Sequence, residues 1–166
     1  NSKNETKSHE INMAFSFNDA YKNKVKKIKI DNQQFLIPLD RRVYEINNYK
    51  FKIHIKDDKL FKVIDDYDIE LDLEISLYEA LFKKEFYFSD PFKNNIKITI
   101  NKSILNNNEF KIENMGLPKK NETRGDLYIN FIIDESEINQ DFFKNKSSDI
   151  NKQLTKLLNN HIEAPK

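Results

Sequence analysis

The chain has 166 residues, 38% of them hydrophobic and 33% charged, with a formal net charge of +1 at pH 7. This length suits one ordinary domain or two small ones, and the small net charge argues against a nucleic-acid module driven by a basic field. The chain has no cysteine, which rules out disulfides, cysteine zinc sites and thiol chemistry. No apolar run approaches the length of a membrane span. We therefore expect neither nucleic acid nor membrane as a partner.

The chain begins with Asn and has no signal-like apolar segment, so we expect a piece of a longer protein. The lack of cysteine fits a reducing compartment, and we expect a cytoplasmic location. Any targeting signal would lie outside this piece.

Alternating apolar residues predict a series of short strands in the first half of the chain. In residues 24–30, Ile28 and Ile30 share one face while Lys27 and Lys29 project from the other. The strands expected in this half are 11–15, 24–30, 35–39, 43–46 and 49–55, with a helical turn at 16–22 and Pro38 at an edge.

The second half repeats this order. A strand at 71–75 leads to Ser76 and Glu79, whose spacing is that of a capping box at a helix start, and an aromatic strand follows. Ser16 and Asp19 form a weaker echo of that cap. Further along, 96–100 answers 35–39, Ile104-Leu105 answers Val43-Tyr44, and 127–133 answers 49–55 after an insert. The segment 65–68 is expected to be a hinge and a solvated turn; it lacks the Gly and terminal Glu of a calcium loop.

The two glycines of the chain, Gly116 and Gly125, both lie in that insert. We expect them to mark backbone with positive φ, which other side chains resist. A phosphate-binding loop is disfavoured, because no Gly-rich cluster precedes a helix here.

Helical spacing returns near the C-terminus and predicts a terminal helix with an apolar stripe. The stripe packs either on its own domain or on a partner chain, and the residues alone leave both readings open. Its members are Ile150, Leu154, Leu157 and Leu158.

No catalytic constellation is visible. His9, His54 and His161 are scattered, and none pairs in sequence with a nucleophile or with acids at metal-binding spacing. We expect a protein that is not an enzyme and binds no cofactor or metal.

Three motifs in the second half suggest a family. The stretch ISLYEAL, the later ENMGLP, and RGDLYINFII follow one another in the order and spacing of the C-terminal substrate-binding region of DnaJ-type (J-domain, heat shock protein 40) co-chaperones, which the chain resembles. The absence of cysteine repeats makes it similar to the class without a zinc finger. The first half looks like a shortened copy of the preceding repeat of that family.

The resemblance implies a shallow apolar groove in the first subdomain that holds extended segments of unfolded client polypeptides. The groove would be lined by Ile11, Met13, Ile28, Ile30 and Phe51. It also implies a basic strand, Lys26, Lys27 and Lys29, that binds the acidic C-terminal tail of a heat shock protein 70 chaperone, and a homodimer joined through the C-terminal helix. The residues alone also fit a plain core with a solvated lysine edge.

The sequence departs from the family in several places. No J domain with a His-Pro-Asp motif is present in this piece, and Lys83, Asn23 and Asn114 stand where the family commonly has glycine. Asn114 tolerates the left-handed conformation better than most residues.

We therefore predict a mainly β fold of two tandem related β-sandwich-like subdomains with short helical turns, plus a C-terminal helix. The expected bounds are 9–66 for the first subdomain, 67–136 for the second and 137–162 for the helical dimerisation segment. The predicted function is client binding and dimerisation for a J-domain co-chaperone. The alternative is a degenerate relative that acts as a non-catalytic interaction scaffold.

Overall fold

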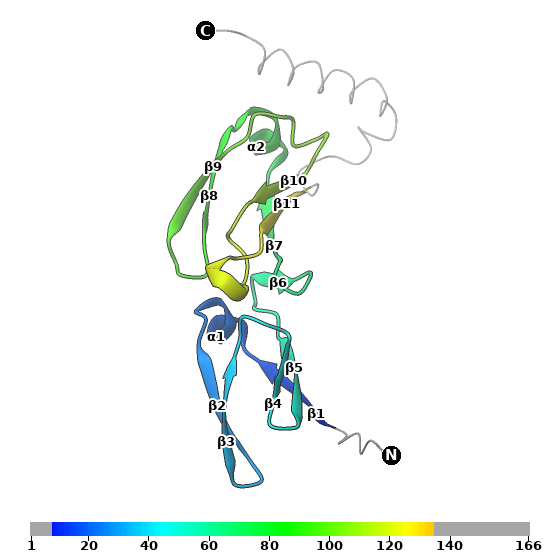
Figure 1. Cartoon of the computed structure of the whole chain (residues 1–166). Coiled ribbons are helices and arrows are strands. Elements are labelled where there is room, and N and C mark those ends of the chain that lie inside the picture. The colour runs from blue at the N-terminus through cyan, green and yellow to red at the C-terminus, as the bar shows by residue number, and fades with distance from the viewer. Residues whose placement is uncertain (1–7, 135–166) are drawn as a thin grey trace, which may run out of the picture. The chain divides into compact units, whose positions relative to one another are not determined.

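The computed structural model describes residues 8–134 (Figure 1). The predicted dimerisation residues Ile150, Leu154, Leu157 and Leu158 lie outside this range, as does the predicted C-terminal helix.

The described part of the chain is mainly β, as the alternating patterns predict. The first half contains β1 (His9–Phe15), α1 (Phe17–Tyr21), β2 (Val25–Ile30), β3 (Gln33–Pro38), β4 (Val43–Ile46), β5 (Tyr49–Ile55) and β6 (Phe61–Val63). The second half contains β7 (Ile69–Ile75), α2 (Leu77–Phe82), β8 (Glu85–Ser89), β9 (Asn95–Thr99), β10 (Glu109–Ile112), the 3-10 turn η1 (Lys120–Glu122) and β11 (Leu127–Ile133).

The chain divides into two compact units that are interleaved in sequence. Unit 1 contains the described residues up to Leu71 together with 111–128, and unit 2 contains 72–110 and the described residues from Ile129 on. The predicted insert thus belongs to the same unit as the N-terminal strands. The predicted subdomain bounds, 9–66 and 67–136, stay a prediction.

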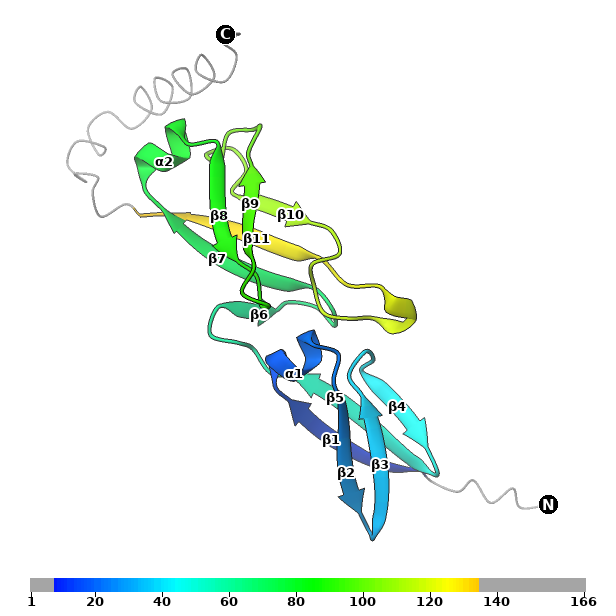
Figure 2. The ribbon, with the colours of Figure 1, turned by 90° about the vertical axis from the view of Figure 1, so that its left-hand side faces the viewer.

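Unit 1 holds a sheet of order β1-β5-β4 and a separate β2–β3 hairpin (Figure 2). β1 pairs with β5 in parallel, with Ile11 opposite Phe51 and Met13 opposite Ile53. The hairpin turns at Asp31 and Asn32, which have φ of 49° and 63°; this positive-φ pair is the turn chemistry that a tight hairpin requires.

The core of unit 1 lies where the hairpin and the sheet meet. The rings of Phe35 in β3 and Phe51 in β5 contact edge to face, with centroids 5.4 Å apart. Phe51, Ile37 and Leu39 have no exposed surface. Because side chains alternate along each strand, this contact means that the faces bearing Ile28 and Ile11 turn toward the same core.

Both short helices begin at a serine, as predicted. The Ser76 hydroxyl accepts from the Glu79 N–H at 3.0 Å, and the Glu79 carboxylate accepts from the Ser76 N–H at 3.2 Å, which completes a capping box. The Ser16 hydroxyl accepts from the Asp19 N–H at 3.2 Å. The two units share this local design.

Unit 2 contains the two-stranded sheet of β8 and β9. A four-stranded sheet has the order β10-β11-β7-β6, and the chain passes from one unit to the other within strands of this sheet. The rings of Phe86 and Phe131 meet with centroids 5.0 Å apart. Ile104-Leu105, the expected counterpart of the strand at Val43-Tyr44, is a turn instead. The run of three asparagines at 106–108 favours that turn, and the N–H groups of Asn106 and Asn107 both donate to the carbonyl of Ser103.

The expectation that both glycines need positive φ is wrong, because neither has it. A Cβ at Gly125 would lie 2.2 Å from the Tyr67 carbonyl oxygen, and one at Gly116 would lie 2.6 Å from the same atom. The glycines therefore permit close approach of backbones. The positive φ falls on Asn114, at 60°, as the sequence suggested, and on Asn23, at 53°.

Candidate functional site

The predicted groove residues lie on two strands that each have one unpaired edge. Among the described strands, β1 pairs only with β5, and β2 pairs only with β3. Ile11 and Met13 on β1 are half-buried, as are Ile28 and Ile30 on β2. These four side chains therefore line the margins of the unit 1 core and keep part of their apolar surface accessible.

The fifth predicted groove residue, Phe51, has no exposed surface. It lies opposite Ile11 in the parallel ladder and packs against Phe35. Because Phe51 is fully buried, it can contribute to a groove only by packing behind the half-buried side chains that line it.

The three predicted lysines of β2 fall on two faces. Lys27 and Lys29 are exposed on the outer face, beside Leu36 and Val25, each of which is 58% exposed. Lys26 lies on the inner face, half-buried, and its Nζ contacts the Asp19 carboxylate at 2.8 Å. The structure thus separates Lys26 from the other two.

Asp19 anchors the start of the hairpin to α1. It accepts from Lys26 at 2.8 Å and from Lys24 at 3.0 Å. The bond from Lys26, and then that from Lys24, lowers the pKa of Asp19 to about 2.

The far end of the hairpin is held by Tyr49, whose hydroxyl donates to the Asp31 carboxylate at 3.1 Å. That hydrogen bond, which favours the protonated phenol, raises the pKa of Tyr49. The hairpin is therefore fixed to its unit at both ends, and its free β2 edge keeps a defined position.

A second feature of unit 1 was not foreseen from the sequence. Arg124 of the RGDL motif donates to the carbonyls of Gly116 and Tyr21, both at 3.0 Å, and its guanidinium lies 4.6 Å from the Tyr21 ring centroid. It thereby joins the segment 111–128 to α1. The motif marked Arg124 as notable, but no periodicity in the sequence indicates its partner.

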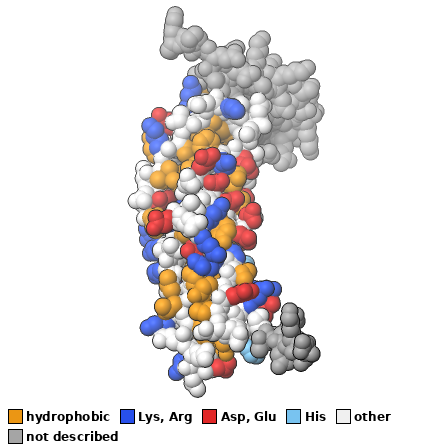
Figure 3. All heavy atoms as spheres, viewed as in Figure 1, with side chains coloured by type: hydrophobic (Ala, Val, Ile, Leu, Met, Phe, Trp, Pro, Cys, Tyr) orange, Lys and Arg blue, Asp and Glu red, His pale blue; other side chains and the backbone are white. Residues whose placement is uncertain are grey.

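Charges of both signs are interspersed over the face drawn in Figure 3. Within residues 8–134 no three His, Cys, Asp or Glu side chains are placed to hold a metal ion. No helix in that range is long and apolar enough to cross a membrane. His54 is exposed, as its place in the strand pattern predicts.

A family model described as "DnaJ C terminal domain" matches residues 42–135, more than half of the chain. The chain belongs to the DnaJ C terminal domain family. The predicted DnaJ C-terminal region is therefore confirmed, and the class without a zinc finger stays a prediction. In general terms, the chain is a J-protein region of the client-binding and dimerisation type.

The match to the DnaJ C terminal domain begins at Arg42. It includes Phe51 but not β1 or β2, which carry the other predicted groove residues and the three lysines. A second model, described as "Heme-binding protein Shr-like, Hb-interacting domain", matches residues 1–75, less than half of the chain. No curated protein matches the chain closely enough to count as a relative.

Proposed function

We propose that this DnaJ C terminal domain binds extended apolar segments of unfolded client polypeptides along β1 and β2 of unit 1. The observation that carries the proposal is the pairing of two free strand edges with four half-buried apolar side chains, within a member of a chaperone family.

The free edges supply affinity that does not depend on client sequence. An extended segment that adds to β2 forms main-chain hydrogen bonds with groups that no described strand uses. Ile28 and Ile30 then contact its apolar side chains, and Ile11 and Met13 extend the same surface. Met13 suits varied clients because its side chain is flexible and polarizable.

We further propose that the outer face of β2 binds the acidic tail of a heat shock protein 70 chaperone, to which the client is delivered. Lys27 and Lys29 have no ion-pair partner among the described residues, so both ammonium groups are available to carboxylates. Val25 and Leu36 offer apolar surface beside them. Lys26 can take part only by leaving Asp19, so its share in tail binding is expected to be the smallest.

Homodimerisation through Ile150, Leu154, Leu157 and Leu158 completes the proposal. Two grooves on one dimer would engage one client with avidity. Sedimentation of the full chain at tens of micromolar tests this: a dimer that is lost on truncation after Asn145 supports it, and an intact chain that is monomeric contradicts it.

Fluorescence polarization with a reduced, carboxymethylated client tests the groove. Replacing Ile28 and Ile30 with Ser should weaken client binding about tenfold or more, because each buried aliphatic contact contributes about 1 kcal/mol or more. Val43→Ser is the matched control, since Val43 is 47% exposed on β4. Equal loss in the control would remove the support for a groove at β2.

A peptide with a carboxylate-rich C-terminus tests the tail site separately. Lys27→Ala with Lys29→Ala should weaken its binding, whereas Lys56→Ala with Lys59→Ala, two exposed lysines elsewhere in unit 1, should not. Unchanged binding in the first pair refutes the tail assignment but leaves the client groove intact.

A second candidate function is a scaffold that binds folded partners and does not hold unfolded chains. The match of residues 1–75 to a domain family named as Hb-interacting favours it. Native and acid-unfolded haemoglobin separate the two candidates. Binding of the native form alone supports the scaffold, and binding of the unfolded form alone supports the client groove.

A further inference from the structure

A cavity of about 380 Å³ lies in unit 1 at the end of β5, on the side of that strand where β4 pairs. Its apolar wall includes Val63 and Ile64, and its rim carries the carboxylates of Asp57, Asp65 and Asp66. A volume near the lower end of the usual range for binding pockets suits a short peptide segment. Since β1 lies on the opposite side of β5, this cavity is separate from the proposed client groove.

The backbone of β5 has an unpaired edge in this cavity. The Ile53 N–H donates to the Arg42 carbonyl at 2.8 Å, the last bond on the β4 side, while the Lys56 N–H donates to Phe15 on the β1 side. Because main-chain groups alternate between the two edges of a strand, the Ile55 N–H points the same way as that of Ile53. Of the described strands, only β1 and β4 pair with β5. The ladder between β4 and β5 stops at Lys52 and does not reach Ile55.

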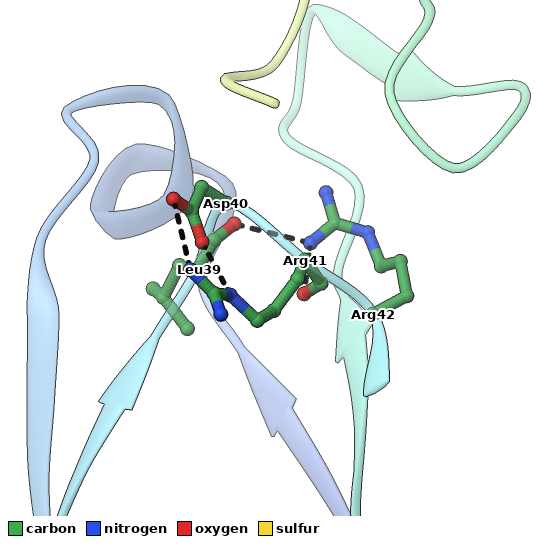
Figure 4. A network of polar contacts seen from close by, with 4 residues as sticks. All are labelled: Leu39, Asp40, Arg41 and Arg42. Carbon is green, nitrogen blue, oxygen red and sulfur yellow. Dashed lines mark hydrogen bonds and ion pairs between the residues drawn. The ribbon is translucent and has the colours of Figure 1, made fainter. Parts of the chain in front are cut away.

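Arg42 explains why the pairing stops there. Its guanidinium donates to the carbonyls of Leu39 at 3.1 Å and Asp66 at 2.9 Å, and it stacks 4.8 Å from the Tyr67 ring centroid. The neighbouring Arg41 is paired with Asp40 at 2.8 Å (Figure 4). These contacts hold the residues before Arg42 away from β5. The unpaired edge of β5 is therefore a fixed part of the fold.

The charges around the cavity select its occupant. Burial lowers the pKa of Arg42. Its Nε and Nη1 donate to carbonyls, its Nη2 is buried without a hydrogen-bond partner among the described residues, and three carboxylates line the same cavity. Asp57 and Asp65 each use one oxygen for a backbone N–H and keep another for a partner. The excess of negative charge attracts a cation, and Ile64, which is 46% exposed, offers apolar contact.

We propose that this cavity binds a short extended segment of a partner polypeptide in which Lys or Arg alternates with an aliphatic residue. The segment adds to β5 as an antiparallel strand in line with β4 and bonds to the Ile55 main chain. Its aliphatic side chain contacts Val63 and Ile64, and its cationic side chains face the rim aspartates. The composition of this partner is opposite in charge to the acidic tail proposed for β2.

Amide hydrogen exchange of the full chain tests the docking mode with acetyl-Lys-Val-Lys-Val-Lys-amide as the probe. Exchange of the Ile55 amide, which belongs to a residue only 3% exposed, should slow at least tenfold further at a saturating peptide concentration. A peptide with Glu in place of Lys should give no protection. Protection confined to the amides of Lys27 and Lys29, which face the unpaired edge of β2 because Ile28 and Ile30 pair with β3, would place the peptide in the client groove and overturn the proposal.

Variants test the side-chain contacts. Asp65→Asn with Asp66→Asn should weaken peptide binding about threefold to tenfold at low salt and remove most of its salt dependence, because exposed ion pairs are weak and screened. Glu45→Gln, an exposed acid on β4, is the control and should change nothing. Ile64→Ser should weaken binding more than Val25→Ser. Full affinity in the aspartate double variant would refute the site.

Discussion

Replacing Gly125 with Ala adds one methyl group at a place where two backbone segments of unit 1 touch. The new Cβ would lie 2.2 Å from the carbonyl oxygen of Tyr67, 2.5 Å from its carbonyl carbon and 2.8 Å from an oxygen of Asp68. Two of these atoms belong to the backbone and cannot turn away. We therefore expect the segment 111–128 to separate from the turn at Tyr67.

The cost follows from the contacts at that place. Forcing a methyl group into a packed site costs about 1–3 kcal/mol. The movement also strains three backbone bonds, Gly125 to Leu117 at 2.9 Å, Gly116 to Gly125 at 2.7 Å and Leu117 to Tyr67 at 2.8 Å, each contributing about 1 kcal/mol. We expect unfolding free energy to fall by about 3–5 kcal/mol, a large part of the 5–15 kcal/mol that is typical of a domain.

Urea denaturation followed by circular dichroism and tyrosine fluorescence measures this effect. At an m-value of about 2 kcal/mol/M, the midpoint should fall by about 2 M. Amide exchange then locates the damage, with the Leu117 and Asp126 N–H groups losing protection first. Lys120→Ala, in the exposed part of the same loop, is the control and should stay within about 0.5 kcal/mol.

A midpoint for Gly125→Ala equal to that of the control would refute the close-approach account of this glycine. Loss of stability without loss of protection at Leu117 and Asp126 would show that the damage lies elsewhere.

Three further predictions concern single contacts. Asp19→Asn should lower stability near neutral pH, and its difference from the parent chain should vanish as pH falls from about 4 to about 2, because the folded pKa of about 2 lies below the ordinary 3.8; urea midpoints across pH measure it. Ser76→Ala should lower the free energy of unfolding by about 1 kcal/mol through loss of the α2 cap, whereas Ser76→Asp should keep most of that stability; urea midpoints measure both. Arg124→Ala should lower the free energy of unfolding by about 3 kcal/mol or more, because two carbonyls lose a charged donor and the Tyr21 ring loses its cation contact. Arg124→Lys should restore only part of that free energy. An alanine variant at 124 with unchanged stability would show that these contacts add nothing.

Local features of this fold could be predicted because local chemistry determines them. Two-residue alternation located the strands from β1 to β5, and the spacing of Ser76 and Glu79 located the start of α2. Each of these depends only on neighbours in the sequence. The left-handed Asn114 was expected from the glycine that the family commonly has at this position, because asparagine tolerates that conformation better than most residues.

Features that depend on distant partners could not be predicted. The role of the glycines depends on Tyr67, about 50 residues earlier in the chain, and no pattern in the insert reports it. The alternation in β2 placed Lys27 and Lys29 on the face opposite Ile28 and Ile30. Lys26 was grouped with these two lysines, and its half-buried ion pair with Asp19 required the observed position of α1. The cavity at β5 was missed for the same reason, since Arg42 and Asp66 meet only in the fold.

The interleaving of the two units has a consequence for synthesis on the ribosome. Unit 1 needs residues 111–128, yet its first part ends at Leu71, so the whole of 72–110 emerges before the last piece of unit 1 is made. At about 5–20 residues per second, the 57 positions between Leu71 and Tyr128 take about 3–11 s. Hairpins form in microseconds, so the hairpin of the first part can form during that interval. Unit 1 then still lacks the segment 111–128, which Arg124 joins to α1. During its synthesis, this member of a chaperone family therefore carries an incomplete unit 1 until residues 111–128 have been made.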